Sequence, residues 1–156
     1  MSWEELEEAD WSGLPAPVVS LLQEIAVRLD RLVREDESEA IDLRALPIMT
    51  DEDLQQLRDL LGAGEVTATV HAMGATELEE TAFPGVWWVT YFGADGDVVA
   101  ERIEVAWIPD IAVAQAADVG AGLRQLMERL PEAPAAGPDD GAEEGGRPPP
   151  IQWNDD

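Results

Sequence analysis

A Pro-Gly step followed at once by two adjacent tryptophans constrains this chain more than any other feature. Residues 80–88 read E-T-A-F-P-G-V-W-W, and Pro-Gly is typical of a turn that leads into a strand. Successive side chains of a strand point to opposite faces of the sheet, so Trp87 and Trp88 cannot enter the same core. We therefore expect one indole to be displayed, or to be covered by a second layer or a second subunit. Since exposed tryptophan is costly in a monomer and useful at an interface, the pattern indicates a binding surface.

Hydrophobic periodicity predicts an α+β fold. Apolar residues at helical spacing predict helices over 15–34, from the Thr50 N-cap to Gly62, and from an Asp118 N-cap to about residue 130. Alternation predicts four strands, over residues 65–72, 76–82, 86–92 and 97–107. The segment 41–44 is either an edge strand or an extended lead into the next helix. Short links imply antiparallel pairing, so we expect a four-stranded antiparallel sheet with helices on one face, in the order α-α-β-β-β-β-α, and the other face open.

The chain divides into three parts by composition. Residues 1–14 form an acidic N-terminal segment, in which a capping box at Ser2–Glu5 predicts a short helix. Residues 15–130 form the α+β domain. Residues 131–156 are rich in proline, glycine and acidic residues, and we expect this tail to be disordered because it cannot bury enough apolar surface to offset the entropy of ordering.

The charge balance excludes several classes of partner. The chain holds 34 acidic and 9 basic residues, a formal net charge of −25, and all the basic residues are arginine. Such a surface repels phosphate backbones and anionic lipids, so we expect neither nucleic-acid nor membrane binding, whereas basic partners are attracted. No cysteine is present, which excludes disulfides and cysteine-held metal sites within the chain. We expect a cytoplasmic protein, because the sequence shows no secretory signal and no apolar run of membrane-spanning length.

The sequence shows no convincing catalytic set, metal site or cofactor site. His71 is the only histidine, and no ligand spacing accompanies it. Carboxylates cluster at Glu77, Glu79 and Glu80, as chance alone produces in so acidic a chain. Two alternatives stay open. One is a hydrolase that uses Glu79 or Glu80 with His71, which needs a concave pocket and a carboxyl group of raised pKa. The other is an acidic inhibitor that mimics DNA.

Several segments, taken in order, resemble the conserved C-terminal region of the HupH/HyaF hydrogenase expression proteins. The segments that carry the resemblance are I-D-L-R-A-L-P at 41–47, L-L-G-A-G-E-V at 60–66, E-T-A-F-P-G-V-W-W at 80–88, A-E-R-I-E-V at 100–105 and I-P at 108–109. The resemblance covers about residues 15–130. It implies an accessory role, without catalysis, in the maturation of an uptake [NiFe] hydrogenase and of its iron–sulfur small subunit.

The resemblance and the aromatic turn together predict a chaperone that binds the precursor of the small subunit. We expect apolar contacts from Phe83, Trp87, Trp88 and Tyr91, and polar contacts from His71, Glu79 and Glu80. Pro84 and Gly85 set the geometry of the turn. Longer family members resemble two tandem copies of this unit and this chain carries one, so two chains are expected to pair as a homodimer.

Overall fold

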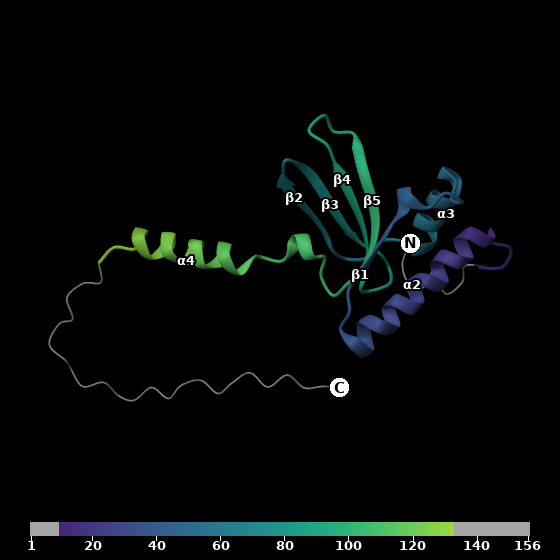
Figure 1. Cartoon of the computed structure of the whole chain (residues 1–156), viewed down its shortest axis with the longest axis horizontal. Coiled ribbons are helices and arrows are strands. Elements are labelled where there is room, and N and C mark those ends of the chain that lie inside the picture. The colour runs from purple at the N-terminus through teal and green to yellow at the C-terminus, as the bar shows by residue number, and fades with distance from the viewer. Residues whose placement is uncertain (1–9, 133–156) are drawn as a thin grey trace. The chain divides into compact units, whose positions relative to one another are not determined.

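The computed structural model describes residues 10–132 and divides the chain into two units, one ending at Ala114 and one beginning at Gln115. Over residues 10–114, the first unit shows two α-helices and a sheet (Figure 1). The predicted N-terminal helix and nearly all of the predicted tail lie outside the described residues. Within residues 10–132, no helix is both long and apolar enough to cross a membrane.

The two helices of the first unit form where the periodicity predicts them. Helix α2 spans Ala16–Glu35 and helix α3 spans Asp51–Leu61. A capping box begins α3, in which the Thr50 side chain accepts from the Asp53 amide and the Asp53 carboxylate accepts from the Thr50 amide. Gly62, with φ of 63°, ends α3 as predicted.

The antiparallel sheet has five strands, not the four that we expected. Its order is β1-β5-β4-β3-β2. The strands are β1 (Glu39–Asp42), β2 (Thr67–Ala72), β3 (Gly74–Glu80), β4 (Val86–Phe92) and β5 (Val98–Val105). The fifth strand is β1. For residues 41–44 we left open an edge strand or an extended lead into the next helix, and the edge strand is present, because residues 39–42 pair with residues 102–105 of β5.

Two smaller boundary predictions were wrong. Strand β3 begins at Gly74 rather than Thr76, because Gly74 (φ 126°) makes a tight turn directly after β2. In the second unit, helix α4 spans Ala116–Arg129 with Gln115 as its N-cap, so Asp118 lies in the first turn instead of capping it. Short 3₁₀ turns occur at Leu43–Ala45 and Asp110–Ala112.

Both faces of the central strand β4 are covered. Trp88 belongs to the main core, which α2 and α3 build over one face of the sheet with β1 and β5. Trp87 lies on the other face with Leu78 and Val89, and its indole Nε1 donates to the carbonyl oxygen of Ala106 at 3.1 Å. The exposed fractions of Trp87 and Trp88 are 6% and 4%.

The indoles thus point to opposite faces, as strand geometry requires. Of the alternatives that we expected for one of them, display at the surface was wrong, because both are covered within the chain itself. The prediction of an open second face was also wrong at its centre, where Leu78 and Val89 are almost fully buried. Tyr91 and Val70 pack around this second cluster. The second face is therefore a small core of its own.

Replacing a core tryptophan should cost far more stability than replacing an exposed one. We expect Trp88→Ala to lower the free energy of unfolding by about 3–5 kcal/mol, since it leaves a cavity under α2 and α3. The control is Trp107→Ala, because Trp107 is 60% exposed and keeps one hydrogen bond to Asp36; its cost should be about 1 kcal/mol or less. Urea unfolding measures both, and equal losses would contradict the assignment of Trp88 to the core.

Candidate functional site

A hollow of about 520 Å³ lies between the C-terminal half of α3 and the strands β2 and β3. It brings together three of the residues singled out in the sequence, Glu79, Glu80 and Trp88. Helix α3 contributes Arg58 and Asp59, and the loop over residues 62–64 closes one end. The hollow therefore combines carboxylates with the edge of an aromatic core residue.

Arg58 organises this hollow. It follows Leu54 by four positions and precedes Leu61 by three, so it shares the face of α3 that turns toward the sheet. Its guanidinium carbon lies 4.9 Å from the centre of the Trp88 ring. Its Nη2 donates a hydrogen bond to Glu79 Oε2, and the two side chains form an ion pair. The guanidinium thus bridges the indole and the carboxylate, and fixes both beside the hollow.

The loop after α3 is held close to β3 by backbone bonds. The Gly64 amide donates to the Glu80 carbonyl at 2.8 Å, and the Glu80 amide donates to the Val66 carbonyl at 2.9 Å. A β-carbon at Gly64 would lie only 2.4 Å from the Thr81 carbonyl oxygen. The close approach requires glycine at this position, and it places the Glu80 side chain at the mouth of the hollow.

The Phe83-Pro84-Gly85 turn is largely structural. The Val86 amide donates to the Phe83 carbonyl at 3.0 Å, with Pro84 second and Gly85 (φ 86°) third, as in a type II turn. Gly85 lies against α2, and Phe83 packs edge-to-face with Trp11 at 6.3 Å between ring centres. Of the three turn residues that the sequence assigned to the binding site, Pro84 alone is exposed.

Tyr91 lies on the opposite face of the sheet, away from the hollow. Its hydroxyl donates to Glu104 Oε1 at 3.3 Å, and the Arg102 guanidinium lies 5.2 Å from the ring centre. Burial raises the pKa of Tyr91, and the Glu104 charge raises it further. Burial also raises the pKa of Glu104, against the opposing effects of the Tyr91 hydrogen bond and Arg102. These groups line a separate hollow of about 360 Å³ with Asp110 and Ile111.

The structure does not assemble the hydrolase alternative. His71 is exposed on β2, and among residues 10–132 no hydrogen bond joins it to Glu79 or Glu80. The described residues also contain no group of three His, Cys, Asp or Glu side chains placed to hold a metal ion. Among the residues that the structure describes, the carboxyl group whose pKa is raised is that of Glu104, on the other face of the sheet.

Sequence reasoning missed Arg58 and Glu104. Arg58 had a detectable signal, since it interrupts the leucine stripe of a predicted helix in a chain with few cations. No sequence signal indicated that Glu104 is half-buried, because alternation along the strand places its side chain on the face of the sheet that we expected to be open. Its burial depends on the small second core around Trp87.

The single tyrosine of the chain reports directly on the Glu104 contact. We expect the phenol of Tyr91 to titrate above its ordinary value of 10, and Glu104→Gln to lower this pKa because the neighbouring negative charge is removed. Ultraviolet absorbance of the tyrosinate measures the titration, with circular dichroism to confirm that the fold persists. Asp95→Asn, in the exposed turn between β4 and β5, is the control and should leave the titration unchanged. An unshifted pKa in Glu104→Gln would contradict the contact.

Comparison with known proteins agrees with the resemblance in the sequence. Residues 16–133 match the family described as HupH hydrogenase expression protein, C-terminal conserved region. The hydrogenase expression/formation protein HupH of Rhizobium leguminosarum bv. viciae is 33% identical over 122 residues, which are 73% of this chain and 43% of that protein. HoxQ of Azotobacter vinelandii is 34% identical over 89 residues, 57% of this chain and 31% of that protein.

A solved structure shares the fold. The hydrogenase expression protein HupH from Thiobacillus denitrificans ATCC 25259 superposes with a TM-score of 0.69 and 46% identity, covering 72% of this chain and 93% of that chain. By contrast, this chain spans about a third to two fifths of the curated relatives just named. The family match covers most of the chain, including the whole five-stranded sheet. The chain therefore belongs to the family of HupH hydrogenase expression proteins, whose C-terminal conserved region it carries.

Proposed function

We propose that this protein is an accessory factor, without catalysis of its own, in the maturation of an uptake [NiFe] hydrogenase, and that it binds the immature iron–sulfur small subunit. The observation that carries the proposal is the acidic hollow beside α3 in a member of a hydrogenase expression family. There, Glu79, Glu80 and Asp59 border an arginine–indole stack that is already ordered. An ordered polar site of this kind suits recognition of a polypeptide, since little further ordering is needed on binding.

The negative charge of the chain favours a partner that presents a positively charged segment. A net charge of −25 accelerates encounter with cationic surfaces and opposes anionic ones. Small-subunit precursors of exported hydrogenases carry a twin-arginine leader, by analogy with the family, and such a leader offers the required charge. Glu80 and the exposed Pro84 line a second hollow, of about 570 Å³, on the other side of Gly64. The contact surface thus extends from α3 to the Pro-Gly turn.

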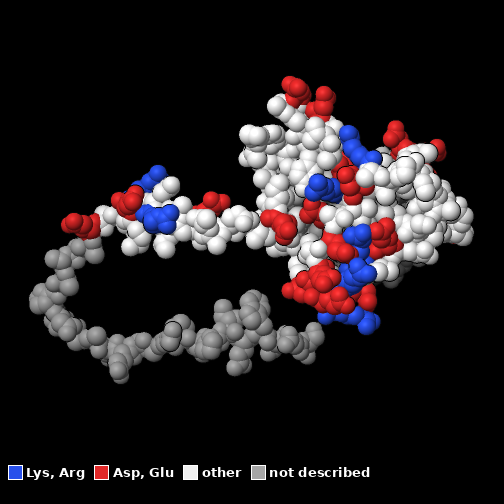
Figure 2. Space-filling model, viewed as in Figure 1, with Lys and Arg blue, Asp and Glu red and all other residues white. Residues whose placement is uncertain are grey.

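A mimic of DNA is less well supported. Such a protein needs rows of carboxylates that are free to replace phosphates, yet three of the five carboxylates along α2 and β1 are paired with arginines. Glu24 binds Arg28, Asp30 binds Arg34, and Glu39 binds both Arg28 and Arg31. Figure 2 shows red and blue atoms side by side over this part of the surface.

The proposal is tested by titrating the purified protein with a small-subunit precursor in a calorimeter at two salt concentrations. We expect a complex that weakens as salt is raised, because surface charge attraction is screened. Glu80→Gln should weaken the complex about tenfold, in line with the loss of one charged contact at an interface. Asp95→Asn changes the net charge equally and should have less than a twofold effect.

Two results would contradict this account. If the wild-type protein forms no complex with the small-subunit precursor, the proposed partner is wrong. If the two variants weaken binding equally, the effect is one of net charge, and the hollow beside α3 is not the contact site.

A further inference from the structure

We propose that the free edge of β2 receives an extended, positively charged segment of the partner, which adds to the sheet as a sixth strand. This inference rests on the proposed function for the identity of the partner. It concerns a different part of the surface from the hollow, because it depends on the backbone of residues 67–72.

The backbone groups of three β2 residues point away from the sheet. Strand β2 is the last in the order β1-β5-β4-β3-β2 and pairs on one side only, with β3. The Glu80 amide donates to the Val66 carbonyl, and residues of an antiparallel strand alternate between the two sides. Ala68 and Val70 therefore bond toward β3, whereas Thr67, Thr69 and His71 direct their amides and carbonyls outward. Within residues 10–132 no strand lies beyond them.

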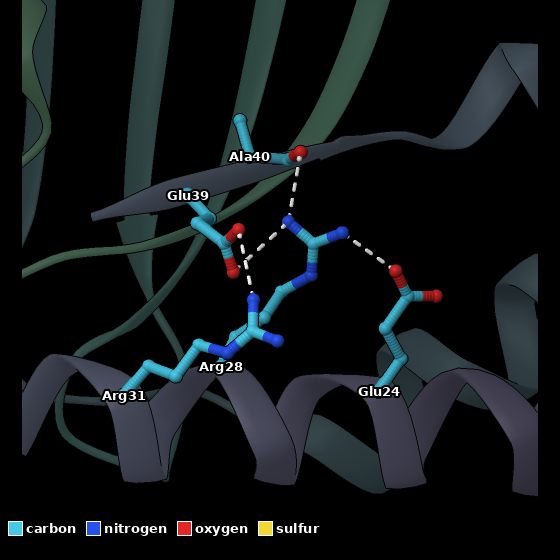
Figure 3. A network of polar contacts seen from close by, with 5 residues as sticks. All are labelled: Glu24, Arg28, Arg31, Glu39 and Ala40. Carbon is cyan, nitrogen blue, oxygen red and sulfur yellow. Dashed lines mark hydrogen bonds and ion pairs between the residues drawn. The ribbon is translucent and has the colours of Figure 1, made fainter. Parts of the chain in front are cut away.

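The opposite edge of the sheet shows how this protein protects an edge strand. Strand β1 has four residues, of which two are acidic. Arg28 of α2 donates from Nη1 to the outward carbonyl of Ala40 at 3.3 Å and also pairs with Glu39, and Arg31 adds a second contact to Glu39 (Figure 3). A short strand, charged residues and a covering element are the usual protections against strand addition.

Within residues 10–114, strand β2 has none of these protections. It has six residues, and it contains no Asp, Glu, Lys, Arg or Pro. All but Val70 are exposed, and Figure 2 shows a largely uncharged surface over this side of the sheet. A bare edge of this length binds extended peptides through main-chain hydrogen bonds. In a chain with 34 acidic residues, six successive positions without Asp, Glu, Lys or Arg along this edge of the described sheet fit a site for a ligand.

The charges beside β2 select a basic segment over a second copy of this chain. Glu77 of β3 lies directly opposite Thr69 of β2, with its side chain on the same face of the sheet, and it is exposed. It has no hydrogen bond or ion pair within the described part of the chain. An added strand would lie about 10 Å from β3, two strand spacings away, which an arginine side chain spans toward Glu77. Pairing β2 with β2 of a second copy would instead bring together two chains of net charge −25 each.

The test removes an outward amide without disturbing the sheet. Proline is tolerated on an edge strand where the amide faces solvent, so Thr69→Pro should fold while its ring blocks the incoming strand. Thr69→Ala keeps the amide and is the matched control. We expect Thr69→Pro to weaken binding of the small-subunit precursor at least tenfold and Thr69→Ala to change it less than twofold, by calorimetry. Thermal unfolding confirms that both variants fold.

Amide hydrogen exchange of the wild-type protein tests the same proposal without the variant, and so remains available if Thr69→Pro does not fold. We expect slowed exchange at Thr67, Thr69 and His71 with either of two probes, the precursor or a synthetic peptide of alternating arginine and valine. If the precursor binds without this protection, strand addition is wrong and the proposed function stands. If the precursor does not bind and only the peptide protects β2, strand addition stands and the proposed partner is wrong. If the precursor does not bind and neither probe protects β2, both proposals are overturned. A second copy of the chain would be the occupant if two results coincide. The β2 amides would be protected from exchange without any ligand, and light scattering would show a dimer that Thr69→Pro dissociates. These results would overturn the proposal that β2 binds a basic segment of the partner.

Discussion

The burial of β4 on both faces is the constraint on which the rest of the structure depends. Residues Val86–Thr90 are all buried, so the strand needs cover from two directions. Helices α2 and α3 supply it on the Trp88 side, and a smaller cluster around Leu78 supplies it on the Trp87 side. The type II turn at Pro84-Gly85 starts this strand and is itself packed against α2. Turn, strand and helical layer thus form one cooperative unit.

Because both tryptophans are buried, the binding surface that we propose lies at the margin of the sheet. Side chains that fill a core are not free to contact a partner, so Trp88 acts by holding Arg58 in place. Several of the nine arginines also make contacts within the chain. Arg28 and Arg31 protect the β1 edge, Arg58 orders the hollow, and Arg102 covers Tyr91. Within the first unit, from residue 10 onward, no arginine covers the β2 edge or pairs with Glu77 or Glu80, which lie on the neighbouring strand β3.

Local patterns in the sequence predicted most of the fold. Helical spacing, the Thr50 N-cap and the alternation in β4 all depend on near neighbours in the chain. The fifth strand was harder to predict, because four residues of β1 gain their pairing from β5, some sixty residues later. The burial of Trp87 was missed for a related reason: its hydrogen bond to Ala106 and its packing against Leu78 are tertiary. Periodicity assigns a side chain to a face but does not show what covers that face.

For the candidate site, the sequence located Glu79, Glu80 and Trp88 but not the arginine that joins two of them. It also grouped His71 and Tyr91 with these residues, whereas the structure places Tyr91 on the other face and His71 at the free edge. Residues close in sequence on a strand point to alternate faces, and their grouping is therefore set by register.

Photo-crosslinking from a single position tests the central claim most directly. A benzoylphenylalanine in place of Thr67, which borders both the hollow and the β2 edge, is compared with the same group in place of Val27, which is exposed on α2. In a mixture of small-subunit and large-subunit precursors, the account predicts crosslinks to the small subunit from position 67 alone. Crosslinks from position 27, or to the large subunit, would contradict it.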